Sequence, residues 1–412
     1  MLMRVEDGAF ASRLLGATTP PATRVRVLET LRWMRALDAV LQPLCRRPLT
    51  SLDAGVRATL RLGLVEHVRL GLPPALATDG AVWVVKRLGL TSAAGMVNAV
   101  LRKAATAWKG QMAAATVDVR MSHPWWLYSR WLERFGEAAA EQSMAAAQEP
   151  AATWVWFLDD TARQELVDDE VVLAPHPWCP GAWSAPDDVG RLVAHVMNGS
   201  AYAQDPSSQI VAHVARSVHR GGGRFLDLCA APGGKTALAA SLGGWKLMAA
   251  SDLLLPRVRL MGPLLRTVGG AAAVAGDALQ PPFKEAAWDV VLLDAPCSGT
   301  GPFRRHPELK WRLRPGSIDE LAARQRQMVS RALELAAPGG VVLYATCSVE
   351  AEENEEIVSA VPRGVVIEDL EPALPPGVPW IPTAAGGVRI LPNPNGDGFT
   401  VHAVRREEVV TR

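Results

Sequence analysis

The sequence predicts an α/β protein with an all-α bundle at the N-terminus, a small mixed connector, and a parallel sheet covered by helices on both faces. Three patterns support this fold class. Apolar residues recur every three or four positions between residues 24 and 108, and short apolar runs alternate with Pro and Gly between 150 and 200. From about Ser200 onward, β-rich runs alternate with helical stretches. The predicted domains are therefore 1–140, 141–200 and 201–412.

Length and composition describe a core-forming chain of more than one domain. The chain has 412 residues, of which 49% are hydrophobic and 21% charged, enough for a core in each of two or three domains. Lys and Arg (43) nearly balance Asp and Glu (42), which excludes a uniformly basic nucleic-acid binder. Residues 1–148 nevertheless hold 19 Lys and Arg against 11 Asp and Glu. This excess of +8 predicts an N-terminal third that faces a polyanion.

Cysteine usage and the start of the chain indicate a cytoplasmic location. The five cysteines are odd in number and scattered, and their spacing fits neither a disulfide framework nor a zinc site, so no metal is expected. The start, MLMRVEDGAF, lacks the apolar core of a signal peptide, and no run is long and apolar enough for a membrane span. We expect a monomer that does not contact membranes.

Helix breakers divide the N-terminal part into separate helices. Pro and Gly interrupt the apolar pattern at 20–21, 47–48 and 71–74. Thr50-Ser51 is expected to cap a helix that begins near Leu52. Further helices are predicted over 74–88, 92–107 and 125–147. The arginines on these helices mark either the polyanion-facing surface or an ordinary solvated face.

The C-terminal part reads as strands and helices in alternation. Strands are predicted at 224–228, 246–251, 272–275, 289–293 and 341–345, and helices between them at 235–242, 256–268 and 320–337. Such alternation implies right-handed crossovers and a parallel sheet. The final run, 399–404, is expected to join that sheet as an antiparallel strand. Ligands of such folds bind beyond the carboxyl ends of the strands, and the unusual residues of this chain follow those ends.

The first predicted strand runs into a glycine-rich turn. Asp227 near the strand end is followed by Cys229, Ala-Ala-Pro-Gly-Gly and Lys235, where backbone N–H groups allow a ligand to approach closely. A phosphate-binding loop is excluded, because it needs a glycine where Cys229 stands. An ordinary strand-to-helix turn remains the alternative.

Three acidic residues follow the next strands in order. Asp252 ends the second strand, where a carboxylate is able to bind both hydroxyls of a ribose. Asp277 follows the third strand and suits an exocyclic amine, and Asp294 ends the fourth. Helix or turn capping is the alternative for each one alone. Three successive strands that each end in a carboxylate predict an adenosine-sized pocket.

Two cysteines follow the fourth and fifth strands. Cys297 lies in Asp-Ala-Pro-Cys and Cys347 in Tyr-Ala-Thr-Cys-Ser. Adjacent parallel strands lie about 4.8 Å apart, so the two sulfurs are expected to flank a single bound base. Buried structural cysteines are the alternative. Nucleophilic chemistry explains the pair better, and it requires a site that lowers the pKa of at least one thiol.

A basic segment lies between the two cysteines. RRHPELKWRLR contains Arg304, Arg305, His306 and Lys310, which we expect to contact backbone phosphates and a splayed base. A solvated run of charges is the alternative.

At these motifs the sequence resembles the RsmB/Sun family of RNA cytosine-C5 methyltransferases. The resemblance rests on LDLCAAPGGKT, on LLDAPCSGTG followed by RRHPELKW, on YATCSVEAEEN and on NGDGF, across about residues 200–407. NAVLRK and SHPWWL look like the NusB-like RNA-binding domain of that family. The resemblance implies a Rossmann-like, class I methyltransferase domain that uses S-adenosyl-L-methionine, preceded by a NusB-like domain. It implies a bacterial enzyme that methylates a cytosine of 16S rRNA.

The family motifs also imply roles for particular residues. Cys347 corresponds to the nucleophile, and Cys297 to the residue that assists product release. Asp294 would stabilise charge at the N3/N4 edge of the base. The implied S-adenosyl-L-methionine site is Cys229, Ala230, Ala231, Pro232, Gly233, Gly234, Lys235, Asp252, Asp277 and Asp294.

Other interpretations remain open at this stage. The chain is either an active RNA methyltransferase or a NusB-like RNA-binding assembly factor whose methyltransferase domain is inactive. A DNA cytosine-C5 methyltransferase would use the Pro-Cys thiol, Cys297, as nucleophile, and a tRNA is an alternative substrate to rRNA. One departure from the family is residues 154–159, WVWFLD, which lack the arginine and asparagine usual there and so weaken any RNA contact from that segment.

Overall fold

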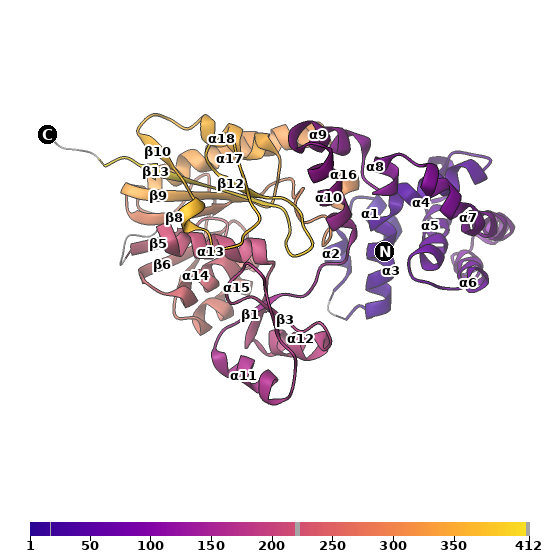
Figure 1. Ribbon diagram of the computed structural model, residues 1–412, viewed down its shortest axis with the longest axis horizontal. Coiled ribbons are helices and arrows are strands. Elements are labelled where there is room, and N and C mark those ends of the chain that lie inside the picture. Colours follow the sequence, from indigo (N-terminus) through magenta and orange to yellow (C-terminus); the bar gives the residue numbers. More distant parts are fainter. Residues whose placement is uncertain (17, 219–222, 409–412) are drawn as a thin grey trace. The chain divides into compact units, whose positions relative to one another are not determined.

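The chain folds into two units, and each unit contains two separate stretches of the sequence. The computed structural model describes residues 1–16, 18–218 and 223–408. The helical unit comprises Met1–Pro150 and Phe303–Leu313, and the sheet unit comprises Ala151–Pro302 and Arg314–Arg412 (Figure 1). Among the described residues, no helix combines the length and the apolar character that crossing a membrane requires.

The helical unit contains only helices and turns, as the apolar spacing predicts. Its core is leucine-rich, and Leu37, Leu41, Leu60, Leu64 and Leu101 are each at most 3% exposed. The longer helices are α3 (Pro21–Arg32), α4 (Met34–Leu41), α5 (Ala54–Val68), α6 (Pro74–Arg87), α7 (Ala94–Ala114), α9 (Trp125–Phe135) and α10 (Glu137–Gln148). The short ones are α1 (Leu2–Glu6), α2 (Ala11–Leu14), α8 (Val117–Arg120) and α16 (Leu309–Arg312).

Two expectations about these helices are wrong. Asp53 caps α5, since its Oδ1 accepts the Gly55 amide at 2.8 Å, whereas Thr50-Ser51 lie in a 3-10 turn. The single helix predicted over 125–147 is divided into α9 and α10. Gly136 separates them at φ +77°, a backbone conformation that ends a helix and that glycine adopts without a Cβ clash.

Lys310 fixes the 303–313 segment inside the helical unit. Its side chain is 1% exposed, and Nζ donates to the carbonyls of Arg32 and Ser122 at 3.0 Å each and to Oε1 of Gln148 at 2.9 Å. Burial, reinforced by the charge of Arg32, lowers the pKa of Lys310 well below its ordinary value. The three oxygens match the three donors of an ammonium group.

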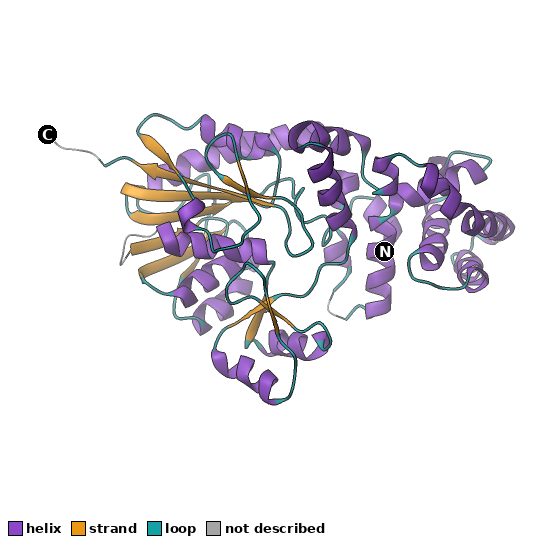
Figure 2. Ribbon diagram, in the orientation of Figure 1, coloured by secondary structure: helices purple, strands orange, loops and turns teal. Residues whose placement is uncertain are grey.

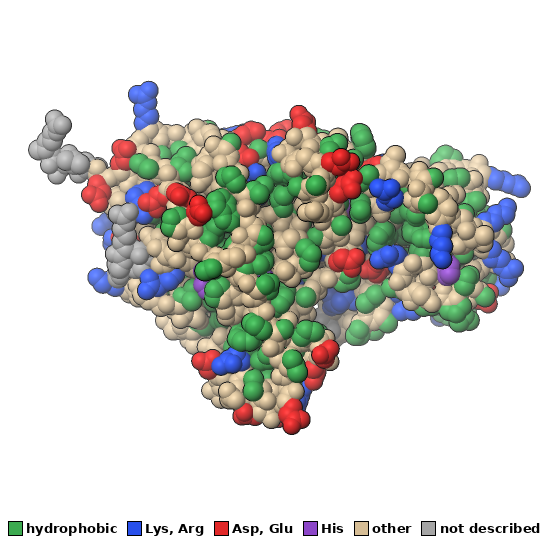
Figure 3. All heavy atoms as spheres, viewed as in Figure 1, with side chains coloured by type: hydrophobic (Ala, Val, Ile, Leu, Met, Phe, Trp, Pro, Cys, Tyr) green, Lys and Arg blue, Asp and Glu red, His purple; other side chains and the backbone are tan. Residues whose placement is uncertain are grey.

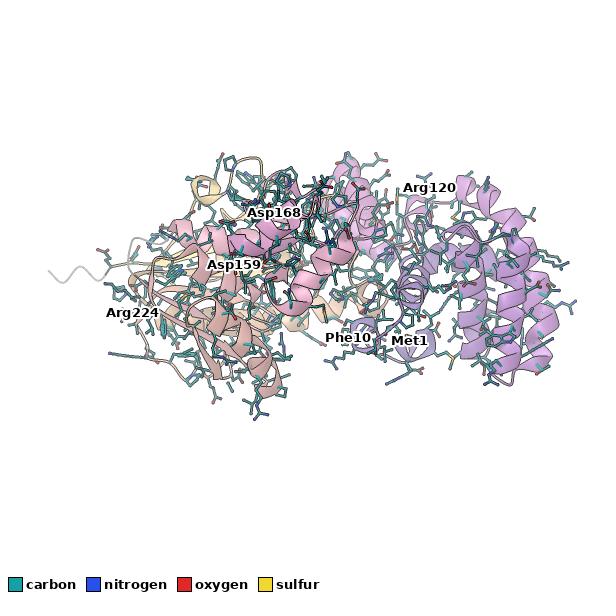
Figure 4. All side chains as sticks on the ribbon, turned by 90° about the horizontal axis from the view of Figure 1, so that it is seen from below. Met1, Phe10, Arg120, Asp159, Asp168 and Arg224 are labelled. Carbon is teal, nitrogen blue, oxygen red and sulfur yellow. The ribbon has the colours of Figure 1, made fainter. Side chains whose placement is uncertain are left out.

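Further contacts hold both ends of the same segment. Trp311 Nε1 donates to the Leu31 carbonyl at 2.7 Å, and the Arg312 guanidinium lies 4.1 Å from the centre of the Phe10 ring (Phe10 is labelled in Figure 4). Two more bonds join Arg32 Nη2 to the Arg304 carbonyl at 2.7 Å and the Ala11 amide to Glu308 Oε1 at 3.2 Å. The helical unit is therefore complete only with a segment that begins at Phe303, 153 residues after Pro150, the last residue of its first stretch.

Replacing Lys310 with methionine is expected to destabilise the helical unit. Methionine fills a similar volume but removes the ammonium donor from three buried oxygens, at about 1–3 kcal/mol for each group left unpaired, while the Arg32 carbonyl keeps its 3.3 Å bond from Nε2 of Gln148. Part of this loss is offset because the ammonium no longer has to be buried. We expect the first unfolding transition in differential scanning calorimetry to fall by roughly 5–10 °C.

Lys103→Met, at an exposed position of α7, is the matched control and should change the transition by no more than about 2 °C. An unchanged transition in Lys310→Met would contradict this expectation and would show that the cost of desolvating the ammonium fully offsets its hydrogen bonds.

The connector region of the sheet unit is a small antiparallel sheet with two helices. Its strands are β1 (Val155–Phe157), β2 (Ala174–Pro175), β3 (Trp183–Ser184) and β4 (Ala201–Ala203), in the order β2-β3-β1-β4. The helices are α11 (Asp160–Asp168) and α12 (Val189–Asn198). Asp159 begins α11 by accepting the Ala162 amide, and Figure 4 labels Asp159 and Asp168 at its two ends.

Acidic side chains gather on this connector (Figure 3). The exposed ones near α11 are Asp159, Asp160, Glu165, Asp168, Asp169 and Glu170. Like charge disfavours contact with nucleic-acid phosphates. This surface agrees with the absence of the arginine and asparagine from residues 154–159.

The large sheet has a parallel centre and an antiparallel extension (Figure 2). Its parallel strands are β5 (Gly223–Asp227), β6 (Trp245–Asp252), β7 (Ala272–Ala275), β8 (Trp288–Asp294) and β9 (Ala336–Thr346), in the order β9-β8-β5-β6-β7. The antiparallel strands are β13 (Phe399–Arg406) beside β9, then β12 (Val388–Ile390) and β11 (Ile381–Pro382), with β10 (Val365–Glu368) also paired to β13. The final antiparallel strand that the sequence predicts is confirmed.

Alternation along the strands creates two cores, one on each face of the sheet. Phe225 and Leu292 belong to one core, and their neighbours Leu226 and Val291 belong to the other. The first core is covered by α13 (Pro206–Val218), α14 (Gly234–Leu242) and α15 (Leu255–Thr267), and the second by α17 (Pro315–Leu335) and α18 (Glu355–Ser359).

The predicted elements of this sheet are confirmed, with differences at their ends. The predicted helix 320–337 begins earlier, at Pro315, and ends earlier, at Leu335. Proline is favoured in the first helical turn because it lacks an N–H that would be unpaired there, so Pro315 starts the helix and does not interrupt it. The strand predicted at 341–345 already begins at Ala336, opposite Trp288.

Candidate active site

The two cysteines that follow β8 and β9 lie against each other. β8 and β9 are parallel neighbours with Asp294 opposite Ala345, so the loops after them leave the sheet at the same edge. The Sγ atoms of Cys297 and Cys347 are 3.3 Å apart, and both side chains are partly exposed. The predicted proximity of the sulfurs is confirmed. That the two sulfurs flank a single bound base stays a prediction.

The surroundings of Cys297 favour its neutral thiol. Its hydrogen bond with Cys347, then burial, then the charges of Glu353 and Asp294 raise the pKa of Cys297 well above its ordinary value. Cys297 therefore keeps its proton at neutral pH and is able to donate it toward the sulfur of Cys347.

Lys235 and Asp294 form an ion pair at the same edge. Lys235 lies in the first turn of α14, and its Nζ is 2.6 Å from Oδ2 of Asp294, the last residue of β8. Burial opposes the charged form of Lys235, but the charge and hydrogen bond of Asp294 prevail and raise the pKa of Lys235. The ring of Phe399 lies below the ammonium, 5.3 Å from Nζ to the ring centre. The ion pair thus places a positive and a negative charge together at the edge that carries the two thiols.

The glycine-rich turn after β5 is tightly packed. Gly233 has φ +105°, and a Cβ on Gly234 would lie 2.4 Å from Cε1 of Tyr202. The Ala230 amide donates to the Ser251 carbonyl at 2.8 Å, which ties the turn to β6. Cys229 is packed in this turn, and burial, then the charge of Asp227, raise the pKa of its thiol. Cys229 therefore belongs to the turn and not to the pair formed by Cys297 and Cys347.

The predicted carboxylates follow neighbouring strands at this edge. Asp252 is the last residue of β6 and is 3% exposed, with Oδ2 3.1 Å from Nη1 of Arg257. Arg257 also donates to the Ala231 carbonyl at 2.6 Å and so joins the turn to β6. Asp277 lies just beyond β7, where its Oδ1 accepts the Leu279 amide at 2.9 Å. Along the edge, Asp294, the turn, Asp252 and Asp277 thus follow the strand order β8-β5-β6-β7.

Asp227 is a buried carboxyl for which the sequence motifs predict no role. It is 1% exposed at the end of β5, and its Oδ2 accepts the hydroxyl of Thr236 at 2.7 Å. Its Oδ1 is buried without a hydrogen-bond partner among the described residues. Burial raises the pKa of Asp227 to about 7. The sequence signal for it is an acidic residue directly after the apolar pair Phe225-Leu226 at the end of a strand.

The NGDGF motif packs against the loop that carries Cys297. The Gly398 amide donates to the Gly301 carbonyl at 3.3 Å, and the Gly301 amide donates to the Cys347 carbonyl at 3.0 Å. A Cβ on Gly301 would lie 2.0 Å from the Gly398 carbonyl oxygen, so both loops need glycine there. The motif therefore supports the two cysteine loops and places Phe399 below Lys235.

The structure corrects half of the expected RNA contacts. Arg304 and Lys310 are 4% and 1% exposed inside the helical unit, and Lys310 is bound to three oxygens there. Their role in the fold is structural, so we no longer expect them to bind phosphates. Arg305 and His306 are partly exposed. Among the described residues, no group of three or more His, Cys, Asp and Glu side chains is placed to hold a metal ion.

Comparison with known proteins identifies the family. The family model of the 16S rRNA methyltransferases RsmB/F matches residues 213–404, and the model of the NusB family matches residues 8–106. The ribosomal RNA small subunit methyltransferase B of Thermus thermophilus is 34% identical over 420 residues, covering 98% of this chain and 96% of that protein. The chain belongs to the RsmB/F methyltransferase family.

Other relatives agree with this assignment. The ribosomal RNA small subunit methyltransferase B of Sodalis glossinidius is 32% identical over 393 residues, covering 91% of this chain and 86% of that protein. The crystal structure of PH0851 superposes with a TM-score of 0.77 at 20% identity, covering 98% of this chain and 97% of that one, which shows the shared fold. The predicted fold class, a Rossmann-like methyltransferase domain with an N-terminal NusB-like domain, is confirmed.

The cofactor of this RsmB/F family member is S-adenosyl-L-methionine. The residues at the sheet edge fit it. Carboxylates at the ends of β6 and β7 have the chemistry for ribose hydroxyls and an exocyclic amine, and the glycine-rich turn at the N-terminus of α14 suits a carboxylate. The unpartnered Oδ1 of Asp227 offers a further acceptor.

Proposed function

We propose that this chain transfers a methyl group from S-adenosyl-L-methionine to C5 of a cytosine in 16S rRNA, through a covalent bond between Cys347 and C6 of the base. The observation that carries the proposal is the contact between the two thiols, with the Lys235–Asp294 pair at the same sheet edge. Cytosine C5 is a weak nucleophile, and this arrangement supplies what is needed to activate it.

The residues divide the chemistry among themselves. The Cys347 thiolate forms a bond with C6, which makes C5 enamine-like. Asp294, held by Lys235, hydrogen-bonds the N3/N4 edge and stabilises the charge that develops there. Bound S-adenosyl-L-methionine supplies the methyl group. A base then removes the C5 proton, the Cys347–C6 bond breaks, and Cys297 assists this release.

The surroundings of the two thiols support Cys347 as the nucleophile. Cys297 is favoured as a neutral thiol, and its S–H is able to donate across the 3.3 Å contact. A thiolate is stabilised by such a donor. A DNA methyltransferase would need the opposite assignment, with Cys297 as the attacking group.

The proposed cofactor contacts lie at the same sheet edge, and the proposed RNA contacts lie in the helical unit. We propose that residues 229–235, Asp252 and Asp277 hold the cofactor. Arg305 and His306, together with the basic helical unit, are proposed to contact RNA. The target base must be unstacked, because a base inside a duplex is unable to reach the thiols.

Bisulfite mapping of rRNA tests this function. Cytosine methylated at C5 resists bisulfite conversion, so one 16S cytosine should be protected in cells that carry the gene and unprotected in cells that lack it. Purified protein with labelled S-adenosyl-L-methionine should restore the methyl group to rRNA from the deletion strain. Transfer to tRNA alone would select the tRNA alternative, and the absence of transfer to any RNA would favour the assembly factor.

A further inference from the structure

Each of the two cysteines is followed by a buried serine. Ser298 and Ser348 are 3% and 0% exposed, and their hydroxyl oxygens are 3.2 Å apart. The two serines are thus in contact with each other, as the two cysteines that precede them are. A cluster of hydroxyls buried this deeply requires a strong acceptor.

That acceptor is the carboxylate of Glu353, which is 0% exposed. Its Oε1 accepts the Ser298 amide at 2.8 Å and Nε2 of Gln325 at 3.1 Å, and its Oε2 accepts the Ser298 hydroxyl at 2.5 Å. Gln325, on α17, also donates to the Pro296 carbonyl at 2.8 Å. The residues immediately before and after Cys297 are therefore both connected to Glu353.

The Cys347 loop is joined to the same group. Ser348 hydrogen-bonds the Glu353 side chain, and Tyr344, three residues before Cys347, donates from its hydroxyl to the Glu353 carbonyl at 2.5 Å. Next to Glu353, Asn354 accepts the Thr346 hydroxyl at 2.8 Å. The bonds around residues 353 and 354 thus reach both neighbours of Cys347.

Burying a carboxylate is costly, and the bonds have to offset that cost. Burial raises the pKa of Glu353, while the hydrogen bonds from Ser298, Ser348 and Gln325 oppose that shift. An apolar side chain would avoid the cost of burying a charge but would remove the acceptor of the Ser298 amide and of its hydroxyl. What the carboxylate adds is a fixed geometry for two separate loops.

We propose that Glu353 is a positioning residue that holds the Cys297 and Cys347 loops in register, so that the two thiols act on one base. This inference rests on the proposed methyl transfer for its effect on rate, but not for its effect on geometry. A group that acts through hydrogen bonds to two loops affects the turnover number more than cofactor binding.

A dithiol probe tests the geometry without requiring activity. Phenylarsine oxide binds two neighbouring thiols as a chelate, with loss of water, and holds them more tightly than a single thiol. Wild-type protein should retain the arsenical during washing with a monothiol, whereas Cys297→Ala and Cys347→Ala should release it. We expect Glu353→Ala to lower the apparent affinity for the arsenical by about tenfold or more, because displaced loops separate the two sulfurs.

Steady-state kinetics supply the second measurement. Glu353→Ala should lower kcat for methyl transfer by roughly 100-fold with little change in KM for S-adenosyl-L-methionine. Glu353→Gln keeps one acceptor oxygen, and the serine hydroxyls are able to rotate, so both chelation and kcat should stay within about fivefold of wild type. Gln325→Leu removes the bond from Gln325 to Glu353 and leaves the carboxylate in place. This variant replaces Glu353→Ala in both measurements if Glu353→Ala does not fold.

The matched control is Glu356→Ala, an exposed glutamate one turn further along the chain, which should behave as wild type in both measurements. Full chelation and full kcat in a folded Glu353→Ala would overturn the positioning role. An inactive wild type that still chelates the arsenical, with chelation lost in Glu353→Ala, would contradict the proposed methyl transfer and leave the positioning role supported.

Discussion

Replacing Cys347 with alanine is expected to lower methyl transfer by about four orders of magnitude or more, as loss of a covalent nucleophile does in other enzymes. C5 of cytosine is then no longer activated, and neither Asp294 nor Cys297 replaces a bond to C6. The measurement is transfer of labelled methyl groups to rRNA from a strain that lacks the gene. No covalent protein–RNA species should form.

Cys45→Ala is the matched control for Cys347→Ala. Cys45 is a free, partly buried thiol of the helical unit, outside the sheet edge that carries the reactive pair. It should keep wild-type transfer. Unchanged activity in Cys347→Ala would contradict the covalent mechanism, and an RNA adduct that persists in this variant would transfer the role of nucleophile to another thiol.

Replacing Cys297 with alanine is expected to trap the enzyme on its product. Cys347 still attacks and methylation proceeds, but release slows because the thiol that contacts the Cys347 sulfur is missing. A protein–RNA band should accumulate on a denaturing gel that includes no reductant, and turnover should fall to about one methyl group per enzyme. The band should contain the methyl label, which shows that the block follows transfer.

The double variant Cys297→Ala/Cys347→Ala separates the two roles. It should form no adduct, because the nucleophile is lost together with the release group. A Cys297→Ala variant that turns over normally, without a trapped band, would count against the release role. An adduct that requires Cys297 and forms without Cys347 would instead indicate the mechanism of the DNA enzymes.

The sequence predicts the sheet well because its patterns are local. Strand β7 has the predicted bounds, and β5, β6 and β8 differ from prediction by one residue at each end. Alternating apolar runs and helical spacing are properties of short segments, so the chain reveals them directly. The errors in helix bounds occur where a single residue ends or begins a helix, as Gly136 and Pro315 do.

The residues of the candidate site also fall into two groups, those that local sequence patterns predict and those that depend on the folded structure. Asp252, Asp277 and Asp294 are recognisable because each follows a strand, and parallel strands end at one edge. The role of Lys310 was predicted wrongly, since a run of Lys and Arg does not reveal which cation will be buried. Glu353 could not be singled out because its partners, Ser298 and Gln325, are 55 and 28 residues away in sequence.

The sequence by itself determined the alternation of strands and helices, the family motifs and the edge at which the reactive groups gather. Only the tertiary structure decided that the two sulfurs touch, that residues 303–313 complete the helical unit, and that one buried carboxylate connects both cysteine loops. The physical reason is the range of the interactions. Propensity and periodicity act within a few residues, whereas burial and hydrogen bonding of Lys310 and Glu353 depend on groups that meet only after the chain has folded.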